Sequence, residues 1–157
     1  MLFPSESTFG EARFHIFIVS LYSVVWLFHA IHNIYIMSNL THTSTITVSE
    51  QHLASAVGSG DLPVFSTPMM IALMENAAML CIKPELAEGE STVGSHIDVT
   101  HLKPTALGTV VSATATLQVR EGRKLIFHVE ARDSQGLIGE GEHVRYIINK
   151  EKFMSRM

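Results

Sequence analysis

The chain has 157 residues, of which 46% are hydrophobic and 17% charged, and its formal net charge is −4. This length suits one domain with a core of ordinary size. The sequence holds no cluster of lysines and arginines, which argues against a nucleic-acid partner, and its composition excludes collagen-like, coiled-coil and disordered chains. The single cysteine, Cys81, excludes an intrachain disulfide and a thiolate zinc site and fits a reducing, cytoplasmic compartment.

The mean hydropathy is +0.25, and the apolar surplus behind it lies in residues 14–37. Of these 24 residues 18 are apolar, and none is Asp, Glu, Lys or Arg. The stretch reaches the roughly 20 residues of a membrane-spanning helix, although three histidines within it weaken that interpretation. Three interpretations of residues 1–37 stay open: a membrane anchor, an extra apolar helix packed on the domain, or a mis-assigned start with translation beginning at Met37. Residues 38–157 are expected to form the globular domain.

Two short elements are predicted at the start of that domain. Residues 42–48 alternate and are rich in β-branched side chains, which predicts a strand. Ser49 is expected to cap a short helix that reaches Val57. Residues 58–63, with the sequence GSGDLP, predict a loop by their turn-forming residues.

The clearest helix follows this loop. Thr67 is expected to be its N-cap and Pro68 its first residue, and a Lys-Pro pair ends it near Ile82. Its body is apolar on every face and is interrupted only by Glu75 and Asn76. A helix that is apolar all round is usually buried all round, so we expect other elements to wrap it.

After residue 89 the hydrophobic pattern changes to a period of two, interrupted by short turns that contain glycine. This pattern predicts an antiparallel meander. One strand, one buried helix and four long antiparallel strands make an α+β fold in which the sheet curls around the helix. Because such a sheet has open edges, we expect a homodimer. The four strands are predicted over residues 90–103, 109–120, 124–133 and 137–149.

Glu75 is the main anomaly of the sequence, because it lies in the middle of the apolar helix. A buried carboxylate without partners costs several kcal/mol, on the order of the known desolvation penalties. Burial also favours the protonated form and raises basicity, which suits a general base or a nucleophile. The alternative is that Glu75 lies at a sheet edge or an interface and is paired there structurally.

Two further residues are candidates for the same site. Thr67 precedes Glu75 by eight residues, so both can border one cleft, although a helix cap is the simpler interpretation of Thr67. His101 shares a strand face with Ile97 and Val99 and should therefore point toward the core. There an imidazole needs a polar partner, and Glu75 could be that partner. The alternative is a structural histidine.

Gly94 interrupts a predicted strand, which would let a ligand approach the backbone closely. His143 and Arg145 are two apart on the last strand and so face the same way. Arg145 could bind a phosphate or a carboxylate, and a solvated face is the alternative. His29 and His32 have helical spacing but no evident third ligand, so no metal site is expected.

Much of residues 40–154 resembles the fluoroacetyl-CoA thioesterase-like family of hot-dog thioesterases. The resemblance rests on both residue types and spacing. It is carried by the stretches GSGDLPVFSTPMMIALMENAA (58–78) and STVGSHIDVTHLKPTALG (91–108), and it continues through EGRKLIFHVEARD, LIGEGEHVRYII and EKF near the C-terminus.

The resemblance implies a hot-dog fold, a homodimer and acyl-CoA as substrate. It implies Thr67, Glu75 and His101 as catalytic residues and Gly94 and Arg145 as substrate-binding residues. Hydrolysis by these residues needs no cofactor or metal. The fluoroacetyl-specific enzyme carries aromatic gate residues shortly before the helix, where this chain reads GSGD at residues 58–61. Specificity for fluoroacetyl-CoA is therefore not expected.

We expect an acyl-CoA thioester hydrolase for short or small acyl groups, with membrane contact only if residues 14–37 are an anchor. Two alternatives stay open. One is a non-catalytic hot-dog module that binds or senses acyl-CoA. The other is a hot-dog hydratase acting on enoyl or 3-hydroxyacyl thioesters, which usually pairs an Asp with a His that we do not find.

Overall fold

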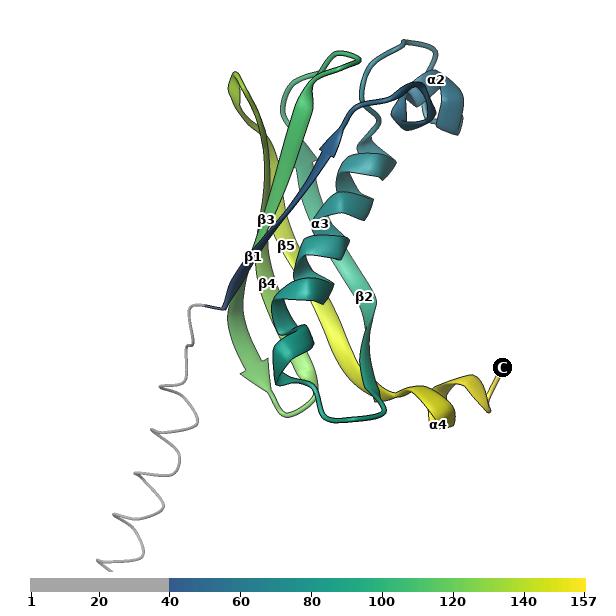
Figure 1. Cartoon of the computed structure of the whole chain (residues 1–157), viewed down its shortest axis with the longest axis vertical. Helices are drawn as coiled ribbons and strands as arrows, with labels where there is room; N and C mark the ends of the chain where they lie inside the picture. Colours follow the sequence, from purple (N-terminus) through teal and green to yellow (C-terminus); the bar gives the residue numbers. More distant parts are fainter. Residues whose placement is uncertain (1–39) are drawn as a thin grey trace, which may run out of the picture. The chain divides into compact units, whose positions relative to one another are not determined.

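The computed structural model describes residues 40–157. The apolar extension expected over residues 1–37 lies outside the described residues, as do its histidines. Within residues 40–157 we find no helix with the length and apolar character that crossing a membrane requires. Five antiparallel strands form one sheet in the order β1-β3-β4-β5-β2, which packs on helix α3 (Figure 1). The strands are β1 (Thr41–Thr47), β2 (Glu90–His101), β3 (Val110–Glu121), β4 (Lys124–Asp133) and β5 (Gly136–Asn149).

The predicted meander is right for β3, β4 and β5, which are joined by tight turns and pair in sequence order. It is wrong for β2, which pairs with β5 at the far edge of the sheet. The connection from β2 to β3 carries the chain across the sheet, because residues 102–109 form a loop rather than a hairpin turn. Strand β2 is therefore an edge strand of 12 residues, longer than the seven-residue β1 at the other edge.

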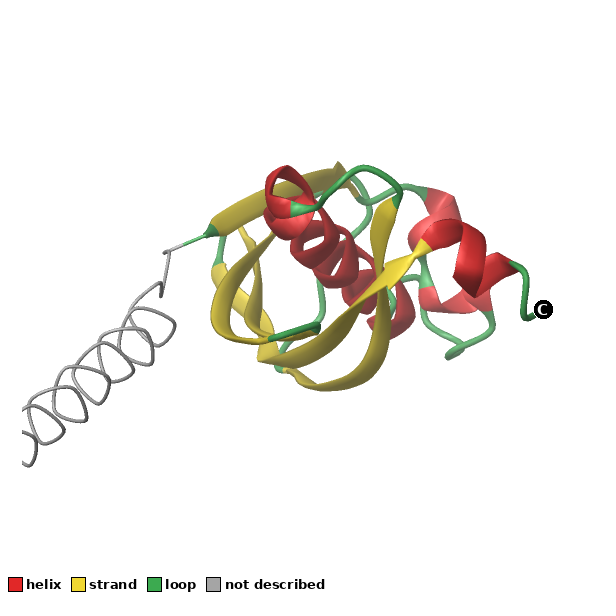
Figure 2. Cartoon of the chain, turned by 90° about the horizontal axis from the view of Figure 1, so that it is seen from below, coloured by secondary structure: helices red, strands yellow, loops and turns green. Residues whose placement is uncertain are grey.

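Helix α3 (Thr67–Ile82) lies in the concave side of the sheet, as Figure 2 shows in a view from below. The prediction that the helix is enclosed on all sides is wrong for the single chain. The sheet covers one side, but the helix is exposed at Ala72, Asn76 and Met79, and Asn76 lies beside the edge strand β1, where its amide oxygen accepts from the Ser44 hydroxyl at 2.7 Å. The buried side of the helix packs on the inward residues of β3 and β4, and both sets belong to one core: Met70, Leu73, Met74, Ala77, Ala78, Cys81, Ile82, Val111, Ala113, Ala115, Leu117, Leu125, Phe127, Val129 and Ala131.

The single short helix predicted after Ser49 is divided in two. A 3₁₀ turn, η1 (Glu50–His52), and one turn of helix, α2 (Ala54–Val57), flank an extended Leu53. Leu53 forms an isolated bridge with Phe65 and buries its side chain, which explains the break. Helix α3 continues into the 3₁₀ turn η2 (Lys83–Glu85). A C-terminal helix that the sequence did not predict, α4 (Lys150–Met154), follows β5.

A β-bulge in β2 sets which side chains reach the helix. Gly94 pairs with Arg145, but the next pair is His96 with Val144, so Ser95 is the extra residue. Before the bulge, the even-numbered positions Thr92 and Gly94 face inward, whereas beyond it the odd-numbered His101 does. Both halves of this strand therefore present residues to α3.

Candidate active site

The N-terminus of α3 is built differently from the prediction. The N-cap is Ser66, whose hydroxyl accepts a hydrogen bond from the Met69 backbone amide at 3.3 Å. Thr67 is the first helical residue and Pro68 the second, so the expected capping role of Thr67 is wrong. Because Ser66 supplies the cap, the Thr67 hydroxyl is free for another partner.

That partner is His101 at the end of β2. The Thr67 Oγ1 atom lies 2.9 Å from His101 Nδ1. Burial lowers the pKa of His101 below its ordinary value of 6.5, against a smaller opposing effect of the Lys103 backbone, so the imidazole is neutral at neutral pH. Its Nε2 atom is buried and has no hydrogen-bond partner within residues 40–157. The pair thus offers a hydroxyl and a neutral imidazole whose Nε2 atom makes no hydrogen bond within residues 40–157.

Glu75 lies two turns further along α3, and its surroundings differ from those predicted. Its side chain is 42% exposed, so the expectation of full burial is wrong. It lies beside His143 on β5, with 3.5 Å between Glu75 Oε1 and His143 Nε2. The expected partner His101 instead bonds Thr67. The carboxylate is thus accessible.

His143 and Arg145 form a buried polar network beneath Glu75. His143 is 1% exposed and Arg145 7%, so the solvated face that the sequence left open is excluded. Arg145 donates from Nε to the Thr92 hydroxyl and from Nη2 to the Thr92 carbonyl, each at 3.0 Å. Its Nη1 atom lies 3.0 Å from His143 Nε2. The sequence placed these two side chains on one face but gave His143 no role; their period-two relation to buried Ile147 is the signal that identifies the face as the inner one.

Gly94 lies directly opposite Glu75. A Cβ atom added to Gly94 would come within 2.7 Å of Glu75 Oε1 and 3.0 Å of His143 Cε1. Real Cβ atoms essentially never approach so closely, so a side chain at this position would force the Glu75 carboxylate to shift. The predicted close approach to the backbone at Gly94 is therefore present, with the Glu75 carboxylate as the group that makes it.

The five predicted site residues thus fall into two groups on one side of the sheet. Thr67 and His101 meet at the start of α3, whereas Glu75, Gly94 and Arg145 gather with His143 near its middle. Eight helical residues separate Thr67 from Glu75, which corresponds to about 12 Å along the helix axis. Within the described part of the chain no hydrogen bond or ion pair joins the two groups.

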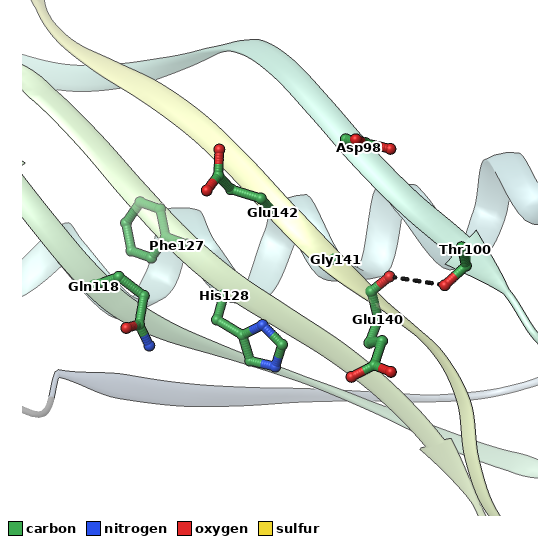
Figure 3. A pocket seen from close by; sticks show the side chains of 8 residues that line it. All are labelled: Asp98, Thr100, Gln118, Phe127, His128, Glu140, Gly141 and Glu142. Carbon is green, nitrogen blue, oxygen red and sulfur yellow. Dashed lines mark hydrogen bonds between the residues drawn. The ribbon is translucent and has the colours of Figure 1, made fainter.

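Other features of the described residues lie apart from this site. A shallow depression on the outer face of the sheet is lined by Asp98, Glu140 and Glu142, with His128 and Gln118 beside them (Figure 3). It contains none of the predicted site residues. Among residues 40–157 no group of three His, Cys, Asp or Glu side chains is arranged to hold a metal ion. Burial raises the pKa of the Cys81 thiol, which keeps it protonated at neutral pH.

Comparison with known proteins gives a consistent result. Residues 48–151 match the profile of the family described as fluoroacetyl-CoA-specific thioesterase. The fluoroacetyl-CoA thioesterase of Streptantibioticus cattleyicolor is 42% identical over 94 residues, which are 60% of this chain and 68% of that protein.

Solved structures agree with the sequence match. A structure of the fluoroacetyl-CoA thioesterase FlK has a TM-score of 0.70 at 34% identity, covering 74% of this chain and 90% of that one. A thioesterase superfamily member from Thermus thermophilus has a TM-score of 0.69 at 30% identity, covering 74% and 86%. A sheet curled on one helix with this topology is the hot-dog fold. From its sequence, its fold and these matches, the chain belongs to the fluoroacetyl-CoA-specific thioesterase family, and it is a thioesterase.

Proposed function

We propose that this thioesterase hydrolyses the CoA thioesters of short or small acyl groups, with Glu75 acting on the thioester and Thr67 and His101 assisting. The observation that carries this proposal is the accessible Glu75 carboxylate opposite the bare backbone of Gly94. Structures of FlK mutants contain acetyl-CoA, or fluoroacetate together with CoA, which supports a CoA thioester as the substrate class.

The reaction follows from these groups. Glu75 removes a proton from water, the resulting hydroxide adds to the thioester carbonyl, and the C–S bond breaks to release the CoA thiolate, which then takes up a proton. In the alternative route the Glu75 carboxylate itself adds to the carbonyl, and water hydrolyses the mixed anhydride after the thiolate has left. In both routes the neutral His101, oriented by Thr67, has Nε2 available to handle a proton or to stabilise the developing oxyanion.

The acyl preference is expected to be broad among small groups. The loop at residues 58–61 carries no aromatic side chain and is exposed. We therefore expect fluoroacetyl-CoA and acetyl-CoA to be hydrolysed with similar kcat/KM. A thiol-release screen over acyl-CoAs of increasing chain length, fluoroacetyl-CoA included, tests this. Calorimetric binding of acetyl-CoA without thiol release from any substrate would contradict the proposal and favour a binding module.

We further propose that the working unit is a homodimer formed through β2. This strand has an open edge of 12 residues, and antiparallel pairing with a second copy would extend the sheet. Antiparallel pairing also sets the His101 end of one strand against the lower-numbered half of the other, where Gly94 lies. The Thr67–His101 pair of one protomer would then adjoin the Glu75 group of its partner, which accounts for the distance between the two groups within one chain.

Subunit complementation tests this arrangement. Two inactive variants, Thr67→Val and Glu75→Gln, are mixed, unfolded and refolded together. If each site takes Thr67 from one chain and Glu75 from the other, half of the dimers are mixed and each has one intact site. About a quarter of the wild-type activity then returns, as expected for random pairing of a two-fold dimer. No recovery, with mixed dimers verified by affinity tags, would place each site within one chain, and a monomer in analytical ultracentrifugation would exclude the dimer.

A further inference from the structure

The protonation of His143 is fixed by its two neighbours. Its Nδ1 atom lies 2.8 Å from the backbone carbonyl oxygen of His96. A carbonyl only accepts hydrogen bonds, so Nδ1 carries the proton. Its Nε2 atom lies 3.0 Å from Arg145 Nη1, and a guanidinium only donates, so Nε2 accepts with its lone pair. His143 is therefore a neutral imidazole, in keeping with the lowering of its pKa by burial and by the Arg145 charge.

This tautomer leaves His143 unable to donate to Glu75. The 3.5 Å separation between His143 Nε2 and Glu75 Oε1 is then a contact between two acceptor atoms rather than a hydrogen-bonded ion pair. The Arg145 guanidinium contacts the same Nε2 atom and makes no direct ion pair with any carboxylate within residues 40–157. The single atom Nε2 thus adjoins both the guanidinium, which donates to it, and the carboxylate, which cannot.

The other contacts of Arg145 show how it is held there. Thr92 accepts from Nε and Nη2, and His143 accepts from Nη1, so each nitrogen of the guanidinium has a partner. If the acceptor at residue 143 were lost, Nη1 would be buried without a partner, and Glu75 would be the nearest anion to which it could turn.

We propose that His143 is a positioning residue of the hydrolysis: its neutral imidazole holds Arg145 against Thr92 and thereby keeps the Glu75 carboxylate out of a direct ion pair. The carboxylate remains in the field of the guanidinium but keeps its oxygens free for water or the thioester. This inference rests on the proposed role of Glu75 and assigns a role to a residue that does not itself touch the reacting atoms.

Two substitutions separate this role from a merely structural one. His143→Leu keeps most of the side-chain volume but removes the acceptor, whereas His143→Gln keeps an acceptor for Arg145. The matched control is His128→Leu on the exposed face of β4. The measurements are kcat and KM for acetyl-CoA hydrolysis, the pH dependence of kcat, and the melting temperature, each in the wild-type and the Glu75→Gln background.

For His143→Leu we expect kcat to fall about 10- to 100-fold with little change in KM, the scale expected when a reacting group is misplaced. The acid limb of its pH–rate profile should move to lower pH, because a closer guanidinium favours the ionised carboxylate. The groups that face residue 143 and contribute to this profile are Glu75 on α3, His96 on β2 and Arg145 on β5. His143→Gln should keep the wild-type profile and most of the activity, and His128→Leu should match the wild type.

The Glu75→Gln background distinguishes a positioning role of His143 from a merely structural one. There, His143→Leu should lower the melting temperature as before but leave the residual kcat unchanged, because the group it positions is gone. Additive losses of kcat, or an unshifted profile in His143→Leu, would overturn the positioning role and leave the proposed function standing. Full hydrolysis by Glu75→Gln would overturn the proposed function itself. If His143→Leu does not fold, a folded His143→Gln with a large loss of kcat would also overturn the positioning role.

Discussion

The two polar groups along α3 differ in how completely their hydrogen bonds are satisfied. At the start of the helix, Thr67 and His101 bond each other, and His101 Nε2 is left without a partner among the described residues. At its middle, both ring nitrogens of His143 and all three guanidinium nitrogens of Arg145 have partners. A buried network in which every nitrogen has a partner is rigid, whereas an unused nitrogen can exchange a proton. We therefore expect His143 and Arg145 to fix the position of Glu75, and Thr67 and His101 to take part in proton transfer.

Glu75→Gln should produce the largest effect on activity. The amide keeps the shape of the side chain but cannot accept a proton or act as a carboxylate nucleophile. We expect kcat for acetyl-CoA hydrolysis to fall by about 10²- to 10⁴-fold, the usual contribution of general acid–base catalysis. The melting temperature should change little, because the side chain is 42% exposed. Thiol release and thermal unfolding measure the two effects, and an active Glu75→Gln enzyme would remove Glu75 from the mechanism.

Thr67→Val tests the other group and should have the next largest effect. Valine has the shape of threonine but no hydroxyl, so His101 loses its partner. We expect kcat to fall about 10²-fold, at the lower end of the range for acid–base catalysis, while Thr67→Ser retains most of it.

Ser66→Ala is the matched control for Thr67→Val. It removes the N-cap of α3 and should cost about 1 kcal/mol of unfolding free energy while leaving kcat unchanged. If instead Thr67→Val lost stability and kept its kcat, Thr67 would be a structural residue after all.

Gly94→Ala tests whether the open space opposite Glu75 is used. Because the new Cβ atom would lie 2.7 Å from Glu75 Oε1, the carboxylate must move. Displacement of a catalytic group by about 1 Å can cost up to roughly 10²-fold, and we expect a loss of about tenfold in kcat. Gly60→Ala is the control, because its Cβ atom would meet Ala54 at an ordinary 3.5 Å. Equal activity of the two variants would show that the space is not needed.

The sequence predicts which residues belong to this site better than it predicts which of them lie together. Periodicity placed His101 on the inward face of β2 and His143 beside Arg145 on β5, and the structure agrees. It could not pair Glu75 with the right histidine, because the strand pairing that places His143 beside Glu75 and His101 beside Thr67 joins residues far apart in the sequence. The strand order was likewise only partly predictable. The tight turns correctly indicate the β3-β4-β5 pairing, but nothing in the local sequence indicates that β2 pairs with β5.

The helix shows why composition alone overestimates burial. Ala72 and Met79 are apolar, yet the sheet of one chain leaves both exposed. The N-cap of α3 is a second feature that the local sequence does not decide. Ser66 and Thr67 are both good caps, and the hydrogen bond from Thr67 to a residue 34 positions away decides between them.

The smallest predicted effect is a loss of folding stability at mildly acidic pH, and it involves one histidine from each group, His101 and His143. Burial lowers the pKa values of His101 and His143 below 6.5 in the folded protein. Well above pH 6.5 both histidines are neutral whether the chain is folded or unfolded, so they add no pH dependence there. Below it the unfolded chain binds protons that the folded chain does not, so the free energy of unfolding falls as the pH falls.

Each histidine can contribute at most about 1.4 kcal/mol per pH unit, until the pH reaches its folded pKa. Urea unfolding at pH 7.5, 6.5, 5.5 and 5.0 measures this slope. The lowered pKa of Asp133 acts only at still lower pH, because its ordinary value is 3.8. His101→Gln and His143→Gln should each remove part of the slope between pH 6.5 and 5, and the double variant should remove most of it. A slope that is unchanged in the double variant would show that other groups set the acid stability and that neither imidazole is held neutral by the fold.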